Sequence, residues 1–369
     1  MPKLSNSQLI QLSNDIEQWA TDLGFQQFGI ADIDLSKHEQ HLNQWLQKGL
    51  HGEMEYMARH GSKRSHPEEL VNGTVRVISL RMDYLPPESA APQDILRDKN
   101  KGYISRYALG RDYHKLIRKR LQQLATKMEQ AISLLEPSKN TDFAYRVFTD
   151  SAPVLEKALA EKANLGWMGK HTNLINRKAG SWFFLGEIYT NLPLPVTDQQ
   201  YENHCGSCTA CIDICPTQAI IEPYVVNAKR CISYLTIELH GSIPVEFRKD
   251  IGNRIYGCDD CQLTCPWNRF AKPTNEKDFF SRHKLDDSNL LELFNWDEET
   301  FLKQTEGSAI RRIGFERWQR NIVVALGNAP KSDEIVHALR EGLSARDCRQ
   351  TDMVVEHIEW AISEHSQKT

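Results

Sequence analysis

The chain has 369 residues, more than one typical small domain, so two or three compact units are expected. A formal net charge of -4 excludes a globally basic nucleic-acid-binding protein, and any RNA site must be a local patch. The mean hydropathy is -0.53, and no apolar run reaches the roughly 18 residues that span a bilayer. The N-terminal residues show no signal-peptide core or twin-arginine pair, so we expect a cytoplasmic protein without a membrane segment.

The first 195 residues contain no cysteine and alternate helical with extended patterns. A first helix ending near Gly24 is predicted from apolar residues at helical spacing, which are Leu9, Ile10, Leu12, Ile16 and Trp19. The residue content also predicts strands at 75–80, 143–148 and 182–188 and helices at 113–135 and 154–163. These elements indicate an α/β unit. The segment 86–101 is rich in Pro, Asp and Lys and is expected to form an exposed loop.

A turn-rich segment follows from Asn191 to about Pro273 and holds eight of the nine cysteines. Residues 289–364 are then almost wholly helical in pattern. Short antiparallel helices are predicted at 315–326, 336–343 and 353–362. No fixed-period repeat extends over the chain, so this tail holds at most one helical hairpin of the solenoid type.

The cysteines follow a ferredoxin pattern. The run Cys205-x-x-Cys208-x-x-Cys211-x-x-x-Cys215-Pro has the spacing in which three cysteines hold one [4Fe–4S] cluster and the fourth reaches a second cluster. A later run, Cys258-x-x-Cys261-x-x-x-Cys265-Pro, repeats its last three positions, and Cys231 supplies the missing ligand. The cross-over rule assigns Cys205, Cys208, Cys211 and Cys265 to cluster one. It assigns Cys215, Cys231, Cys258 and Cys261 to cluster two.

The alternative for these cysteines is a pair of structural zinc sites, which also use Cys-x-x-Cys pairs. Zinc does not explain why both runs end in Cys-x-x-x-Cys-Pro, so we favour clusters. The ninth cysteine, Cys348, lies in the helical tail and is interpreted as a small apolar residue without a role in the chemistry.

Several further motifs resemble the epoxyqueuosine reductase family over essentially the whole chain. They are Gly110-Arg-Asp-Tyr-His, Phe148-Thr-Asp-Ser-Ala-Pro-Val-Leu-Glu-Lys, Gly166-Trp-Met-Gly-Lys-His-Thr-Asn, Arg230-Cys-Ile-Ser-Tyr-Leu-Thr, Gly252-Asn-Arg-Ile-Tyr-Gly-Cys-Asp-Asp-Cys-Gln and Arg317-Trp-Gln-Arg-Asn-Ile-Val-Val-Ala-Leu-Gly-Asn. The resemblance implies an enzyme that removes the epoxide oxygen of epoxyqueuosine at tRNA wobble position 34, the last step of queuosine synthesis. It implies cobalamin and two [4Fe–4S] clusters as cofactors.

The resemblance also implies three domains. Residues 1–195 would form an α/β (α+β) cobalamin-binding domain related to that of reductive dehalogenases, and residues 196–280 a ferredoxin-like double-cluster domain. Residues 281–369 would form an α-helical, HEAT-like module that binds tRNA.

Asp150 is the proton donor that the family motif implies. A carboxylic acid donates a proton near neutrality only if burial or the cofactor raises its pKa. The local sequence Thr-Asp-Ser-Ala-Pro at 149–153 is equally typical of a helix start, with Asp150 or Ser151 as the cap. Both roles are compatible if Ser151 caps the helix and Asp150 faces the cofactor.

The resemblance places other residues at the cobalamin. Those matching family contacts are Arg64, Ser105, His171, Leu174 and Leu185, and those beside cluster two are Ser233, Tyr234, Cys258 and Asp259. Without the resemblance, they would be interpreted as loop and core residues. The sequence Asp112-Tyr-His114 lacks the Gly of the Asp-x-His-x-x-Gly cobalamin signature. The resemblance accordingly implies base-off cobalamin without a protein axial ligand.

The unpaired wobble base would be read by stacking, with basic side chains on the backbone. A local basic and aromatic patch is offered by Arg311, Arg312, Arg317, Trp318 and Arg320, although a solvated helix face with Trp318 in the core fits the same pattern. Expected partners are tRNAs for Tyr, His, Asn and Asp and a flavodoxin- or ferredoxin-type electron donor, with the enzyme a monomer. The alternatives are a reductive dehalogenase, which would commonly carry an export signal and a Tyr acid, and a non-catalytic ferredoxin-type carrier.

Overall fold

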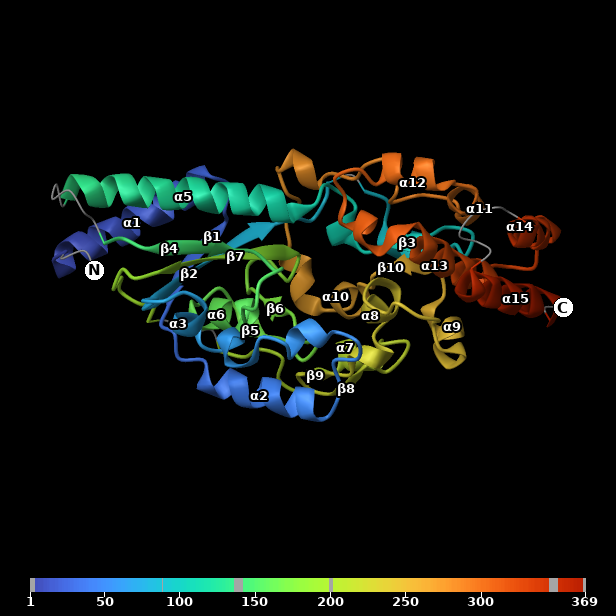
Figure 1. The fold of residues 1–369 in the computed structure, drawn as a ribbon, viewed down its shortest axis with the longest axis horizontal. Helices are drawn as coiled ribbons and strands as arrows, with labels where there is room; N and C mark the ends of the chain where they lie inside the picture. The colour runs from blue at the N-terminus through green and yellow to red at the C-terminus, as the bar shows by residue number, and fades with distance from the viewer. Residues whose placement is uncertain (1–3, 88, 136–141, 199–201, 345–350, 368–369) are drawn as a thin grey trace.

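The computed structural model describes residues 4–87, 89–135, 142–198, 202–344 and 351–367 (Figure 1). The molecule is elongated, and the two ends of the chain lie at opposite ends of its long axis. Among these residues, no helix is both long enough and apolar enough to cross a membrane. Cys348 lies outside the described residues.

A four-stranded antiparallel sheet organises the N-terminal part of the molecule. Its strand order is β1-β2-β7-β4. The strands are β1 (Gln27–Ala31), β2 (Arg76–Asp83), β7 (Phe183–Thr190) and β4 (Tyr145–Phe148). The three predicted strands are confirmed, whereas β1 was not predicted because only Phe28 and Ile30 of its five residues are of strand-favouring types. All eight residues of β7 are buried because the sheet is covered on both faces.

Helices cover the two faces of this sheet. On one face lie α1 (Asn6–Asp22) and α5 (Tyr113–Leu135), which appear above the sheet in Figure 1. On the other side lie α6 (Glu156–Lys162), α3 (Pro67–Leu70) and α2 (Ser36–Gln47). The first predicted helix is confirmed, and a capping box between Ser5 and Gln8 fixes its start. Ile10, however, is 53% exposed and does not belong to its buried face.

The segment 86–101 differs from the expected exposed loop. It contains the helix α4 (Pro92–Arg97), which begins with a proline in its first turn. Pro92 and Ile95 are buried, and the side chain of Asn253 donates to the backbone carbonyl of Ile95 at 2.7 Å. Composition was misleading here because the polar residues occupy only the outer side of this short helix.

The cysteine segment consists of short elements joined by turns. These are α7 (Ala210–Asp213), β8 (Ile220–Glu222), β9 (Val225–Val226), α8 (Ile232–Ile237), α9 (Val245–Ile251), β10 (Arg254–Tyr256) and α10 (Asp260–Leu263). The hairpin of β5 (Trp167–Met168) and β6 (Leu174–Ile175) precedes them. The two cysteine runs lie side by side, since α7 packs against α10.

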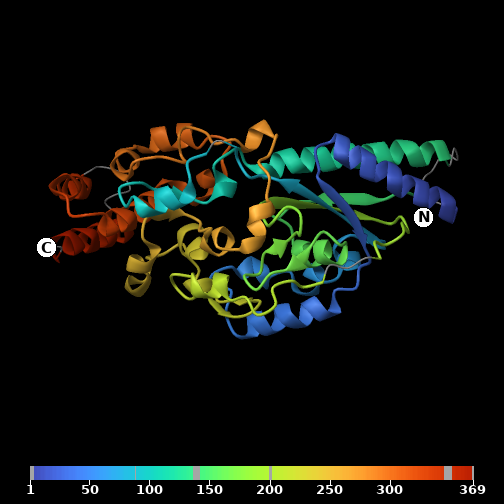
Figure 2. The same ribbon diagram turned by 180° about the vertical axis from the view of Figure 1, so that it is seen from behind.

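The C-terminal part is helical, as predicted. It contains α11 (Leu290–Phe294), α12 (Glu298–Gln304), α13 (Gly314–Asn328), α14 (Asp333–Ser344) and α15 (Asp352–Gln367). From behind, these helices occupy the end of the molecule opposite the sheet (Figure 2). Most residues of α13 are buried, because α15, α11 and β10 all pack against it. The HEAT-like character of this part stays a prediction.

One N-terminal segment leaves the sheet and joins the C-terminal helices. The strand β3 (Tyr103–Ile104) pairs in parallel with β10. Ile104, Ala108 and Leu109 are buried in the same apolar core as Trp318 of α13. Residues expected in the first domain therefore form a structural bridge to the last one, and α5 returns the chain from this bridge to the sheet.

Candidate active site

A cavity of about 380 Å³ lies where the sheet, the β5–β6 hairpin and the cysteine segment meet. Strand β7 contributes Phe183, Phe184 and Leu185, and α6 contributes Glu156 and Lys157. The opposite wall carries the cysteines Cys215, Cys231, Cys258 and Cys261. These are the four residues that the cross-over rule assigns to cluster two, and no residue assigned to cluster one lines the cavity.

The seven cysteines of the two runs and Cys231 form no disulfide bonds in the described part of the chain. Burial raises the pKa of Cys211 to about 11, and its thiol neighbours that add to the rise are, in order, Cys265, Cys205 and Cys208. These are its partners in predicted cluster one. A buried thiolate is unfavourable unless a positive centre balances it, so these residues suit iron ligation.

In the second group the relation is less exclusive, because Cys211 of the first group also raises the pKa of Cys261. Burial raises the pKa of Cys261 well above its usual range, and Cys231 is the strongest neighbouring charge that adds to this rise. Burial also raises the pKa of Cys231, and Cys215 adds to it. The fold therefore brings Cys231 to the later run although 27 or more residues separate them in the sequence.

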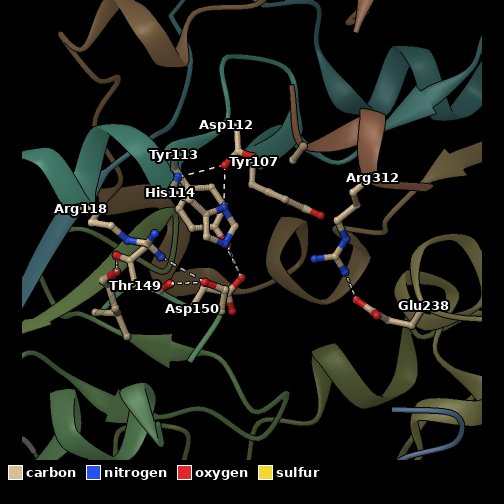
Figure 3. A network of polar contacts seen from close by, with 12 residues as sticks. Tyr107, Asp112, Tyr113, His114, Arg118, Thr149, Asp150, Glu238 and Arg312 are labelled. Atoms are coloured by element: carbon tan, nitrogen blue, oxygen red, sulfur yellow. Dashed lines mark hydrogen bonds and ion pairs between the residues drawn. The ribbon is translucent and has the colours of Figure 1, made fainter. Parts of the chain in front are cut away.

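Asp150 lies just after β4, where the chain turns toward the cavity, and its φ of 49° is in the left-handed region. Its Oδ2 accepts hydrogen bonds from the Tyr113 hydroxyl at 2.7 Å and from Nε2 of His114 at 3.2 Å (Figure 3). The helix-cap alternative is wrong, because α6 begins at Glu156 and has no side-chain cap at Leu155. The strained backbone and two fixed hydrogen bonds favour a role in chemistry.

The pKa of Asp150 differs from expectation. Burial raises it, but hydrogen bonds from His114 and Tyr113 outweigh burial and hold the pKa below its usual value. His114 shows the reverse: burial opposes its charge, yet hydrogen bonds to Asp112 and Asp150 raise its pKa to about 9. These pKa shifts favour a carboxylate at Asp150 and a protonated ring at His114.

Most residues predicted at the cofactor do line this cavity. They are Ser105, Asp150, His171, Leu174, Leu185, Ser233, Cys258 and Asp259. Arg64 and Tyr234 do not line it. Arg64 is buried and donates to the carbonyls of Tyr56 and Val154, and the Tyr234 hydroxyl accepts from the backbone N–H of Glu53 at 2.8 Å.

His171 provides a test of whether a polar cofactor fits. Its Nδ1 accepts from the backbone N–H of Asn173 at 3.1 Å, so the neutral ring carries its proton on Nε2. That Nε2 is buried and has no hydrogen-bond partner within the described residues. Burial lowers the pKa of His171 to about 4, which keeps the ring neutral. An unpaired donor at the cavity wall fits a ligand that offers an acceptor, such as a cobalamin side-chain amide.

Asp259 organises the wall next to cluster two. Its carboxylate accepts from the hydroxyls of Tyr103 at 2.7 Å and Ser105 at 2.6 Å and from the backbone N–H of Arg106 at 2.8 Å. The contacts join β3 to the residue that follows Cys258. Ser105 is therefore held by Asp259, a link that the sequence did not reveal because 154 residues separate the two.

Sequence reasoning missed the polar residues around Asp150. These are Asp112, Tyr113, His114, Glu156 and Lys157. The signal for the first three was present in the motif Gly110-Arg-Asp-Tyr-His, where Asp112 and His114 are two residues apart. Asp150, which Tyr113 and His114 contact directly, lies 36 residues beyond His114 and could not be identified from spacing.

The predicted RNA patch is only partly at the surface. Arg311 and Arg312 are exposed, and Arg312 forms an ion pair with Glu238. Arg317 donates to the carbonyls of Ile313 and Ile237. Trp318 and Arg320 are 0% exposed, so their assignment to a surface patch is wrong.

The position of Arg320 has a clear physical reason. Its guanidinium donates to the backbone carbonyls of Leu235, Leu239 and Gly241 at 2.6–2.8 Å, where α8 ends. Helix ends leave carbonyls without intrahelical partners, and a buried arginine satisfies several of them together. Arg320 thus fastens the cysteine segment to α13.

Two adjacent cysteine runs beside a cavity that is lined by the Asp150 carboxylate define an iron–sulfur oxidoreductase. Family models agree: residues 64–151 match "Epoxyqueuosine reductase QueG, DUF1730", and residues 204–268 match "4Fe-4S double cluster binding domain". Curated relatives named epoxyqueuosine reductase include those of Pseudomonas aeruginosa (57% identical, over 97% of this chain and 95% of the relative) and Escherichia coli (56%, over 98% and 91%).

Solved structures lead to the same family. An epoxyqueuosine reductase crystallised with an epoxyqueuosine-modified tRNA-Tyr stem loop has a TM-score of 0.84 and 26% identity, over 96% of this chain and 90% of that one. The enzyme of Streptococcus thermophilus has a TM-score of 0.84 and 26% identity, over 98% and 92%. This chain belongs to the epoxyqueuosine reductase family.

The structure predicts that Arg320→Met destabilises the protein. Each buried carbonyl left unpaired costs about 1–3 kcal/mol, so a loss of at least about 2 kcal/mol is expected in denaturant unfolding. The control is Arg311→Met at the exposed surface, which should change stability by less than about 0.5 kcal/mol. An Arg320→Met protein that is as stable as the wild type but binds tRNA more weakly would contradict this prediction and support the assignment of Arg320 to the RNA-binding surface.

Proposed function

We propose that this chain reduces epoxyqueuosine to queuosine at the wobble position of tRNA, the last step of queuosine synthesis. The observation that carries the proposal is the position of Asp150, which faces the cavity whose opposite wall holds four cluster-ligand cysteines. Electrons and a proton can therefore reach one bound substrate from two sides. The family relationship supports this reaction over dehalogenation and over simple electron transfer.

The proposed cofactors include two [4Fe–4S] clusters, divided as the cross-over rule predicts. The thiols that act on Cys211 and on Cys231 belong to the same proposed cluster as each of them, which supports this division, although Cys211 also acts on Cys261 of the other group. Of the two proposed sets of ligand cysteines, only the set assigned to cluster two lines the cavity. Cluster one would accordingly receive electrons from an external flavodoxin- or ferredoxin-type protein and pass them to cluster two.

Cobalamin, base-off and without a protein axial ligand, is the proposed third cofactor. When bound, it supplies a low-potential, strongly nucleophilic metal centre for reductive carbon–oxygen bond cleavage. His171 would donate to a polar group of it, while Leu174 and Leu185 would contact its apolar surface. Ser233, Cys258 and Asp259 lie on the wall that carries cluster two.

The tRNA would approach the cavity from the side of the cysteine segment and the helical C-terminal part. Arg312 supports this assignment because it is exposed and its charge acts on Asp150. Arg311 and Arg317 would add contacts to the RNA backbone. Acceptance of tRNAs for Tyr, His, Asn and Asp, the monomeric state, and the boundaries 1–195, 196–280 and 281–369 belong to the same proposal.

Asp150 is the proposed proton donor to the departing oxygen. The overall reaction converts an epoxide, two electrons and two protons into an alkene and water. The chain must therefore deliver protons to an oxygen that gains negative charge as its bonds to carbon break. Asp150 lines the cavity, so it can contact a bound substrate.

The variant Asp150→Asn is expected to retain iron and cobalamin but to lose turnover by about 100-fold or more, because the amide cannot give up a proton. Queuosine formed in epoxyqueuosine-containing tRNA would be measured by mass spectrometry under anaerobic reduction. Asp333→Asn, at the start of α14, is the matched control and should remain active. Wild-type turnover by Asp150→Asn would contradict the assignment.

Pairs of cysteine variants test the division between clusters. Wild-type protein should hold about eight iron atoms, and Cys205→Ala should hold about four. The double variant Cys205→Ala/Cys265→Ala should lose no further iron, since both ligands serve cluster one. Cys205→Ala/Cys261→Ala should lose nearly all of it. If both double variants retain equal iron, the proposed division is wrong.

A further inference from the structure

The imidazole of His114 is held between two carboxylates. Its Nδ1 lies 2.6 Å from Oδ1 of Asp112, and its Nε2 lies 3.2 Å from Oδ2 of Asp150. Figure 3 shows the three side chains as one continuous chain of contacts. A neutral imidazole has only one N–H, so it can donate to only one of the two carboxylates. The protonated ring donates to both, and the geometry therefore favours the charged form.

Several groups contact this ring or act on it electrostatically. Tyr113 stacks on it with a centroid distance of 4.2 Å and also donates to Asp150. The charged and titratable neighbours are Asp112, Asp150, Glu156 and, acting on both aspartates, Arg312. Asp112 and Asp150 raise the pKa of His114 to about 9 against the effect of burial, which favours the protonated ring at neutral pH.

The proposed reaction needs a proton source beyond Asp150, and His114 can be that source. Each turnover consumes two protons, whereas the hydrogen bonds from His114 and Tyr113 keep Asp150 ionised at rest. An ionised Asp150 has no proton to give. The nearest proton on a titratable nitrogen is on Nε2 of His114, already hydrogen-bonded to the carboxylate that must donate.

We propose that His114, held by Asp112, is a positioning residue that supplies Asp150 with the proton it transfers to the substrate oxygen. The inference rests on the proposed function. A proton passes from Nε2 of His114 to Oδ2 of Asp150, and the neutral carboxyl then protonates the oxygen as a carbon–oxygen bond breaks. The electrons come through the clusters from the external carrier. A solvent proton restores the imidazolium, and a second cycle completes the water molecule.

The variant His114→Gln tests the proposal, since its amide can still donate to Asp150 but cannot release a proton. Turnover should fall by about 100-fold or more. Wild-type turnover should decline as the pH rises through about 9, where the imidazolium is lost, and this decline should disappear in the variant. The matched control is His337→Gln on the exposed side of α14, which should keep wild-type turnover and pH profile.

The variant Asp112→Asn separates proton supply from a structural role. It removes a hydrogen bond that raises the pKa of His114, so the decline in turnover should move to lower pH and activity should recover in acid. Nuclear magnetic resonance of 13C-labelled histidine, with the His114 signal assigned by its absence in His114→Gln, should show the same downward shift without any substrate.

The outcomes distinguish the inference from the function on which it rests. An unchanged pH profile in His114→Gln, or a His114 pKa that does not fall in Asp112→Asn, would overturn the relay while leaving the reductase activity intact. If wild-type protein with full clusters and cobalamin forms no queuosine at any pH, the proposed function fails, although the titration of His114 can still be measured.

Discussion

The clustering of cysteine thiols from two adjacent runs is the constraint on which the rest of the structure depends. Thiolates cannot remain charged in an apolar interior without a compensating centre, and here burial raises the pKa of Cys211, Cys231 and Cys261. Iron binding would remove that penalty and couple folding of this segment to its cofactors. The surrounding elements serve to hold the thiols in place: β3 pairs with β10, and Arg320 fastens the end of α8 to α13.

On the other side of the cavity, the charged side chain of Asp150 must be held in place by its neighbours. Asp150 lies in a left-handed turn after β4 and is hydrogen-bonded by two side chains from the start of α5. Because α5 packs along the sheet, the distance between these groups is set by the rigid core rather than by a loop. The sheet therefore has a functional as well as a structural purpose, since it keeps the acid and its partners opposite the cluster wall.

The sequence was sufficient where a signal is local. Amphipathic spacing indicated the bounds of α5, and β-branched and aromatic content indicated β2, β4 and β7, whereas the two cysteine ligand groups stay a prediction. It was insufficient where two interacting residues lie far apart in the sequence. The contacts of His114 with Asp150 and of Ser105 with Asp259 form only when the chain folds. Charge alone also failed for Arg320, because an arginine that satisfies buried carbonyls looks the same in sequence as one that contacts RNA. The prediction of an exposed loop at 86–101 was wrong because a short helix can be polar on most of its surface.

The central claim is that cluster two and a bound cobalamin share one cavity. Electron paramagnetic resonance of the cobalamin-loaded protein tests it most directly, with cobalt held as cob(II)alamin and the clusters reduced. The account predicts a cobalt signal without axial nitrogen splitting, broadened by spin coupling to reduced cluster two and sharpening when the clusters are reoxidised. A cobalt signal that stays sharp beside reduced clusters would contradict it, because the two centres would then lie too far apart to exchange electrons through this cavity.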